Sequence, residues 1–211
     1  MSRTIDDRLR FMKLDQKAQA HVASLKPVVM KALPAALDGF YDQVRATPET
    51  RAFFSSDAHM AAAQNRQLGH WDMISSGQFD DAYAKAVTKV GEVHARIGLE
   101  PSWYIGGYAL VLETLLTKVL EARWPKGGFG ARGPDVKTVA AEVGALTKAT
   151  FLDMDIAISV YLEALETKRV EAEKERRESE EQQNRMVEAL ADGLRRLAGG
   201  DLTANMAGSV E

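Results

Sequence analysis

Apolar residues recur at intervals of three and four along most of the chain. No stretch alternates apolar and polar residues as a half-buried strand would, so the pattern predicts helices throughout and an all-α fold class. The predicted helices are two within 5–30 with a break near Pro27, one opened by Pro34 and ended by Thr47-Pro48, and others at about 58–75, 79–97, 101–124 and from Asp135 onward.

One face of the predicted helix 79–97 combines an imidazole with apolar side chains: Tyr83, Val87, Val90, His94 and Ile97. Gly98 predicts the end of this helix and Pro101 the start of the next. A buried histidine is most often a core residue that a neighbour satisfies. It can also be an axial ligand of haem iron, which needs a neutral imidazole inside an apolar slot. The spacing alone does not choose between these two interpretations.

Tyr41 lies on or beside the buried face of its predicted helix. Its ordinary interpretation is a packed tyrosine whose hydroxyl binds a backbone carbonyl. The corner at 51–57 follows, and its Phe53-Phe54 pair is placed to close one edge of a pocket. The polar residues of the next helix that could approach a ligand are Gln64, Arg66, Gln67 and His70.

Several separated motifs together resemble one protein family. The run from His94 to Tyr104 (HARIGLEPSWY), preceded by His70-Trp71 and by Phe79-Asp80-Asp81, closely resembles the sensor globin domain of globin-coupled sensors, the bacterial haem-based oxygen sensors. Phe40-Tyr41-Asp42 resembles the distal tyrosine motif of that family. The match runs from roughly residue 10 to residue 165. The resemblance implies a globin fold with an extra N-terminal helix.

The same resemblance implies a site. His94 would be the proximal ligand and the only protein ligand of iron in one haem b per chain, held non-covalently because no Cys-x-x-Cys-His motif exists. The implied ligands are O2 and other diatomic gases, CO and NO. His70, the rival axial ligand, is interpreted as a surface residue or a propionate contact. The other implied pocket residues are Phe40, Tyr41, Phe54, Ala63, Gln67, Trp71, Ile97, Trp103, Tyr104 and Tyr108.

The final helix carries apolar residues on more than one side, from Val139 to Tyr161. Such a helix needs a second surface to bury, so we expect a homodimer through the last two globin helices. Residues 1–165 would form the sensor domain and 166–211 a helical stalk. The stalk is charged over 166–185 and then carries a short coiled-coil seam at Val187, Leu190, Leu194 and Leu197.

The segment from Leu197 to Thr203 (LAGGDLT) resembles the Gly-Asp-Leu-Thr element in the signal-relay helices of methyl-accepting chemotaxis receptors. The expected output is therefore an aerotaxis transducer acting on a chemotaxis kinase complex, and the chain is expected to be the sensor part of a longer receptor. The alternatives are a diguanylate cyclase output, a histidine kinase output, or a haem-free helical interaction module.

The composition of the chain excludes or disfavours several classes of function. The 211 residues have a net charge of −3, which disfavours nucleic-acid binding. No cysteine is present, which excludes disulfides and thiolate ligation and is typical of a cytoplasmic protein. A secretory signal and a membrane-spanning run are not expected. The chain carries no phosphate-binding glycine loop, and Gly127-Gly-Phe-Gly130 fits a loop between Trp124 and Pro134. We therefore expect a sensor without enzymatic activity, and a haem oxygenase is the weaker alternative.

Overall fold

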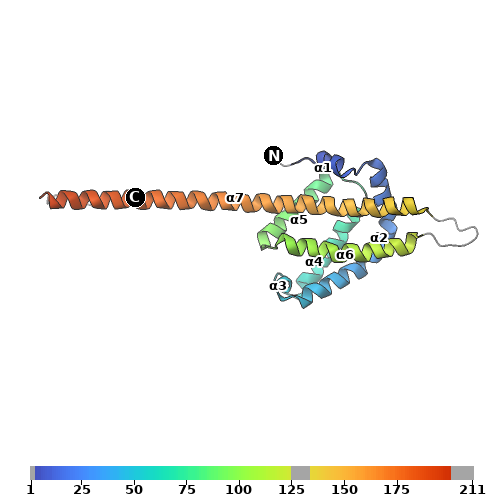
Figure 1. Ribbon diagram of the computed structural model, residues 1–211. Helices are drawn as coiled ribbons and strands as arrows, with labels where there is room; N and C mark the ends of the chain where they lie inside the picture. Colours follow the sequence, from blue (N-terminus) through green and yellow to red (C-terminus); the bar gives the residue numbers. More distant parts are fainter. Residues whose placement is uncertain (1–2, 125–133, 201–211) are drawn as a thin grey trace, which may run out of the picture. The chain divides into compact units, whose positions relative to one another are not determined.

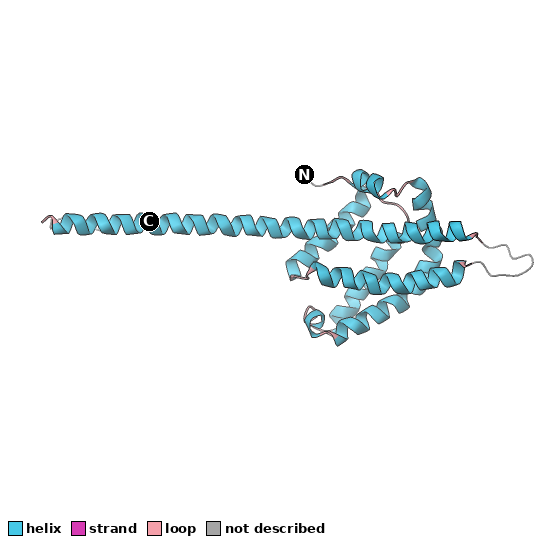
Figure 2. Cartoon of the chain, in the orientation of Figure 1, coloured by secondary structure: helices cyan, strands magenta, loops and turns pink. Residues whose placement is uncertain are grey.

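The computed structural model describes residues 3–124 and 134–200. Every regular element in these ranges is a helix, which confirms the all-α class (Figures 1 and 2). Contacts between residues divide the chain into two units, Met1–Leu162 and Glu163–Glu211. The helices are α1 (Ile5–Met12), α2 (Gln16–Ala46), α3 (Pro48–Arg51), α4 (Asp57–Ser75), α5 (Asp81–Ile97), α6 (Pro101–Arg123) and α7 (Val136–Ala198).

Helix α2 is a single helix of 31 residues that continues through Pro27 and Pro34. The predicted break near Pro27 and the predicted start at Pro34 are therefore wrong. Both prolines lie on the exposed face, where water can hydrate the carbonyls that lose their intrahelical partner. On the opposite face, Val22, Leu25, Val29, Leu33 and Leu37 are fully buried, and this packing outweighs the local penalty of the prolines.

The predicted boundaries around His94 are confirmed. Asp80 caps the start of α5, where its side chain accepts a hydrogen bond from the Tyr83 N–H at 2.9 Å. Gly98 ends the helix in the left-handed region with φ 72°, a conformation that side chains with a Cβ rarely adopt. Pro101 then occupies the first turn of α6. His94 is thus held one turn before a fixed corner.

Helix α7 begins after Asp135, whose side chain accepts from the Thr138 N–H at 2.7 Å. Its residues in the first unit pack into the core through Leu146, Leu152 and Ala157. In the second unit, by contrast, no described side chain is buried. Ion pairs one turn apart, such as Arg169–Glu166, line this part of the helix instead.

No helix within 3–124 and 134–200 combines the length and the apolar character that crossing a membrane requires. The loop predicted between Trp124 and Pro134 falls almost entirely in 125–133, outside the described residues. The Gly-Asp-Leu-Thr element likewise extends beyond Gly200, where the described residues end.

Candidate functional site

A pocket of about 380 Å³ opens between α2, the corner after α3, α4, α5 and α6. This volume lies in the usual range for small-molecule sites. All eleven residues that the resemblance implied line it: Phe40, Tyr41, Phe54, Ala63, Gln67, Trp71, His94, Ile97, Trp103, Tyr104 and Tyr108. The wall also includes Phe53, Arg66, His70 and Val90, to which the sequence pattern pointed. Its other residues were not singled out from the sequence: Val44, Thr50, His59, Ala86, Lys89, Val93, Leu99, Gly107 and Val111.

Helix α5 presents two faces where the sequence suggested one. Tyr83 and Val87 are buried in the core, and Tyr83 does not line the pocket. His94 and Ile97 line the pocket instead, and Ile97 is 46% exposed. The predicted stripe was broad enough to include both faces, because positions three and four apart drift around a helix over several turns.

His94 is a neutral imidazole at the wall of this pocket. Burial lowers its pKa from 6.5 to about 4, although the charge of Asp153 acts in the opposite direction. Its ring packs edge-on against Tyr104, with ring centroids 4.8 Å apart. A neutral imidazole has a free lone pair, which is the form that binds a metal ion.

Tyr41 is buried and keeps its proton. Burial raises the pKa of its hydroxyl to about 12, against the weaker opposing effect of Arg66. Its ring is held edge-on by Phe40 at 4.9 Å and by Phe54 at 6.1 Å between centroids. Its hydroxyl makes no hydrogen bond to any residue that the structure describes, so the predicted bond to a backbone carbonyl is not formed. The donor is available to a molecule in the pocket.

The polar residues in or near the pocket wall on α4 and α5 differ in their burial and in their hydrogen-bond partners. The Gln67 side-chain oxygen is buried and has no hydrogen-bond partner among the described residues. Gln64 lies outside the pocket wall, where its amide donates to Asp38 at 2.7 Å. Arg66 and Lys89 line the pocket from exposed positions and give part of its rim a positive charge.

Gly107 allows α6 to approach α2 beside the pocket. A Cβ built at this position would lie 2.8 Å from the Phe40 ring, closer than side chains tolerate. A larger residue would therefore push Phe40 and change the pocket wall. Gly107 is a site residue that only the three-dimensional structure identifies.

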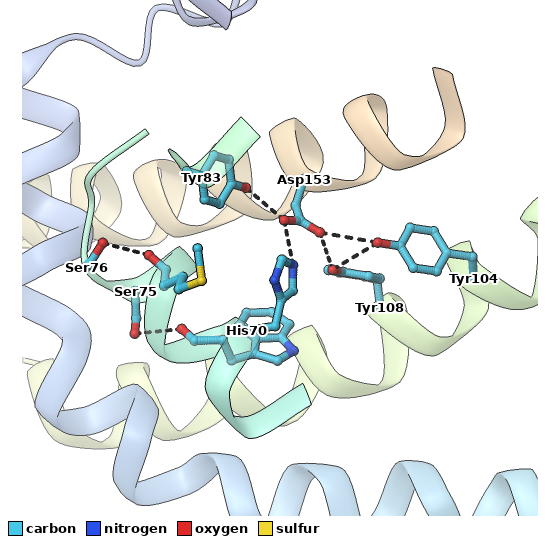
Figure 3. Close-up of polar contacts among 9 residues, drawn as sticks. His70, Ser75, Ser76, Tyr83, Tyr104, Tyr108 and Asp153 are labelled. Carbon is cyan, nitrogen blue, oxygen red and sulfur yellow. Dashed lines mark hydrogen bonds and ion pairs between the residues drawn. The ribbon is translucent and has the colours of Figure 1, made fainter. Parts of the chain in front are cut away.

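His70 is mostly buried and pairs with a buried carboxylate, so its interpretation as a surface residue is corrected, whereas its interpretation as a propionate contact stays a prediction. Its Nε2 lies 2.8 Å from Asp153 Oδ1, and the side chain is only 13% exposed (Figure 3). Burial lowers the pKa of His70, but the hydrogen bond and charge of Asp153 outweigh it and the net shift is upward. Sequence analysis missed Asp153; the available signal was one carboxylate within the apolar run Phe151–Met154 of α7.

These residues fit an iron porphyrin. The pocket wall is mainly apolar and aromatic, it carries one neutral imidazole, and cationic side chains lie where they could pair with carboxylates. A neutral imidazole in apolar surroundings is a residue type that can hold haem iron. No thiolate competes, because the chain has no cysteine.

Known proteins share this architecture. The sequence profile of the Protoglobin family matches residues 1–167. The heme-based aerotactic transducer HemAT of Halobacterium salinarum is 25% identical over 158 residues, which are 74% of this chain and 32% of that protein. The chain thus corresponds to about a third of that relative's length.

Solved structures agree on the globin fold. The globin domain of a Geobacter sulfurreducens globin-coupled sensor superposes with a TM-score of 0.66 at 19% identity, covering 76% of this chain and 99% of that one. The globin domain of E. coli DosC in its ferric form gives a TM-score of 0.56 at 17% identity, covering 72% and 97%. The predicted globin fold is confirmed.

Proposed function

Since this chain belongs to the Protoglobin family, we propose that its first 165 residues form a haem-based gas sensor domain. The observation that carries the proposal is His94, a neutral imidazole at the wall of a pocket that is otherwise mainly apolar. Bound haem b would supply a ferrous iron that takes up diatomic gases reversibly. His94 would be its only ligand from the protein.

Different pocket residues would make different contacts with such a group. Trp71, Trp103 and Phe54 offer flat apolar surface to a porphyrin plane. Arg66 and Lys89 supply positive charge for its two carboxylates. The remaining proposed contacts are Phe40, Ala63, Ile97, Tyr104 and Tyr108.

Tyr41 supports a preference for O2 over CO. Its hydroxyl has a pKa of about 12, so it is protonated at physiological pH, and it has no hydrogen-bond partner among the described residues. Dioxygen held in such a pocket carries more negative charge than carbon monoxide, so it gains more from a hydrogen-bond donor. Gln67 is a second polar group within the same wall.

We further propose that the second unit, with the boundary near residue 165, is a stalk that passes the state of the pocket to an output domain. Exposed apolar residues on the last two helices of the first unit support a homodimer: Ile105 is 45% exposed, Leu110 40% and Phe151 54%. Along the stalk, Val187 and Leu194 are 63% and 65% exposed, as expected of a seam that pairs with a second copy.

The likeness to a transducer named as aerotactic favours a chemotaxis output and a role as a sensor rather than an enzyme. A diguanylate cyclase or a histidine kinase output would use the same domain. We place the protein in the cytoplasm.

An absorption spectrum tests the core of the proposal. The protein purified from haem-supplemented cells should show an intense Soret band with one haem per chain, and the reduced form should change its spectrum with O2 and with CO. His94→Ala should lose most of the haem, whereas the control His21→Ala, outside the pocket wall, should keep it. A wild-type protein without a Soret band would contradict the proposal and favour a haem-free interaction module. Retention of haem by His94→Ala together with its loss from His70→Ala would transfer the ligand role to His70.

A further inference from the structure

Asp153 is a carboxylate with no exposed surface. It lies on α7 between the buried residues Leu152 and Met154. Removing an ionised carboxylate from water costs several kcal/mol unless hydrogen bonds replace its hydration. A residue with this cost needs partners, and the arrangement of those partners indicates what it does.

The partners of Asp153 come from three other helices (Figure 3). Oδ1 lies 2.8 Å from His70 Nε2 of α4 and accepts from the Tyr83 hydroxyl of α5 at 2.8 Å. Oδ2 accepts from the hydroxyls of Tyr104, at 3.2 Å, and Tyr108, both on α6. The single Tyr104 hydroxyl proton is shared between Asp153 Oδ2 and the Tyr108 oxygen, which also lies at 3.2 Å. One side chain of α7 therefore binds α4, α5 and α6.

Asp153 does not line the pocket, but three of its partners do. His70, Tyr104 and Tyr108 are wall residues, whereas Tyr83 is not. Tyr104 in turn packs against the His94 ring at 4.8 Å. One described route from His94 to α7 thus consists of one ring contact and one hydrogen bond, both within a single chain.

Burial and charge keep the tyrosine hydroxyls of this network protonated. Burial raises the pKa of Tyr104 and Tyr108 well above the usual value, and the Asp153 charge raises it further. The hydroxyls therefore remain donors at physiological pH. Because Asp153 accepts these hydroxyl hydrogen bonds through both oxygens, a movement of Tyr104 changes a strong buried interaction.

We propose that Asp153 is a positioning residue: its carboxylate holds Tyr104, Tyr108 and His70 in the pocket wall and couples their position directly to α7 within one subunit. The inference rests on the proposed function in one respect: the signal passed from the pocket to α7 would be the presence of a bound gas. It differs from a route along α6 into a dimer interface, because the coupling to α7 would survive in a monomer.

The test compares holo-protein variants by two measurements, the iron–histidine stretching band of the ferrous form and amide hydrogen exchange over residues 149–157 with and without CO. Asp153→Asn keeps the size of the side chain and removes its charge. It should shift the iron–histidine band and abolish the CO-dependent difference in exchange that the wild type shows. Tyr104→Phe should do the same.

The matched control is Tyr83→Phe, which removes one hydroxyl donor to the same carboxylate outside the pocket wall. It should keep both the wild-type band and the CO-dependent difference. A folded, haem-bound Asp153→Asn protein with the wild-type band and exchange difference would overturn the proposal. So would an equal effect of Tyr83→Phe and Tyr104→Phe, which would indicate general loosening of the core.

Two further outcomes remain decisive. If Asp153→Asn does not fold, the Tyr104→Phe, Tyr108→Phe double variant removes both donors to Oδ2 and leaves the carboxylate in place, and the same two measurements apply. If the wild type binds no haem, the proposed function fails, and the positioning role is then tested by the NMR signals of the His94 ring. Those signals should move in Asp153→Asn and not in Tyr83→Phe; unchanged signals in both would overturn it.

Discussion

Burial keeps His94 and Tyr41 neutral, with opposite chemical results. For His94 it leaves a lone pair free, because the pKa falls to about 4. For Tyr41 it keeps a proton in place, because the pKa rises to about 12. Burial in the same apolar wall thus keeps one side chain able to bind a metal ion and another able to donate a hydrogen bond.

Tyr41→Phe should speed O2 release roughly ten- to hundredfold, because a hydrogen bond to a partly charged acceptor contributes about 1.5–3 kcal/mol. CO release should change little. Stopped-flow measurement of both rates checks this expectation. Phe54→Leu serves as a control for the shape of the pocket, since it alters the Tyr41 packing without removing a donor. Equal changes for O2 and CO in Tyr41→Phe would mean that the pocket was distorted.

The lowered His94 pKa also predicts the acid sensitivity of the haem-free protein. Above about pH 6.5 the ring is neutral in the folded and unfolded chains, so its contribution to stability is complete. As the pH falls from 6.5 toward 4, the unfolded chain binds a proton that the folded chain resists, and the free energy of unfolding decreases. The total loss should be about 3 kcal/mol.

Urea unfolding at about pH 7 and about pH 5 measures the first part of this loss, about 2 kcal/mol. His94→Gln should show a shallower decrease than the wild type. The raised pKa of His70 acts in the opposite direction, with stability lost as the pH rises, but it is common to both proteins and cancels in the comparison. Parallel pH profiles would show that His94 titrates normally in the folded chain.

The implied pocket residues could be predicted because they belong to motifs with fixed spacing. A motif can be recognised in the sequence even when the neighbours of its side chains in the folded protein are not known. Asp153 could not be identified that way. It is one acidic residue in a long helix, and its role depends on donors as far away in the sequence as His70. Gly107 was missed for a similar reason, because only the approach of Phe40 distinguishes it from its neighbour Gly106.

At the scale of the helices, sequence signals predicted the helix ends near His94 correctly and failed at two prolines of α2. Gly98 and Pro101 marked real ends because each meets a local requirement of the backbone at a helix terminus. Pro27 and Pro34 did not end α2, because the buried face of that helix provides more stability than two missing hydrogen bonds remove. Local rules therefore predict helix ends until tertiary packing opposes them.

Helix α1 is fixed to α7 by Arg8, which is 7% exposed and pairs with Asp155. Its guanidinium also donates to the Ser159 hydroxyl at 3.3 Å. Arg8→Met should lower the free energy of unfolding by about 1–3 kcal/mol, because it breaks charge-assisted hydrogen bonds at a buried position. Chemical denaturation measures the change.

The matched control is Arg10→Met. Arg10 is on the same short helix and pairs with Asp7 at 3.5 Å, but its side chain is 78% exposed. Exposed ion pairs contribute at most about 1 kcal/mol, so this variant should be nearly neutral. Equal losses in the two variants would assign the effect to helix propensity rather than to the pair with Asp155.

At the scale of the whole molecule, a gas can shift a conformational equilibrium only by its different affinities for the two states, typically about 1–3 kcal/mol. Spin labels at Glu188 of each subunit should therefore report different distances with and without O2. Tyr104→Phe should reduce that difference while haem stays bound. A chain that is monomeric at micromolar concentration would remove the premise of this experiment, and an unchanged distance in a longer, signalling-competent receptor would exclude the stalk.

The absence of any buried side chain among the described residues of the second unit has a practical consequence for handling the protein. A helix that has only ion pairs between its own turns opens often, and its arginines and lysines then become substrates for trypsin. Digestion should begin at positions such as Lys168 and Arg169 before it reaches the packed residues around Tyr161. Pairing with a second copy would hide the same bonds, so the rate of cleavage should fall as the protein is concentrated.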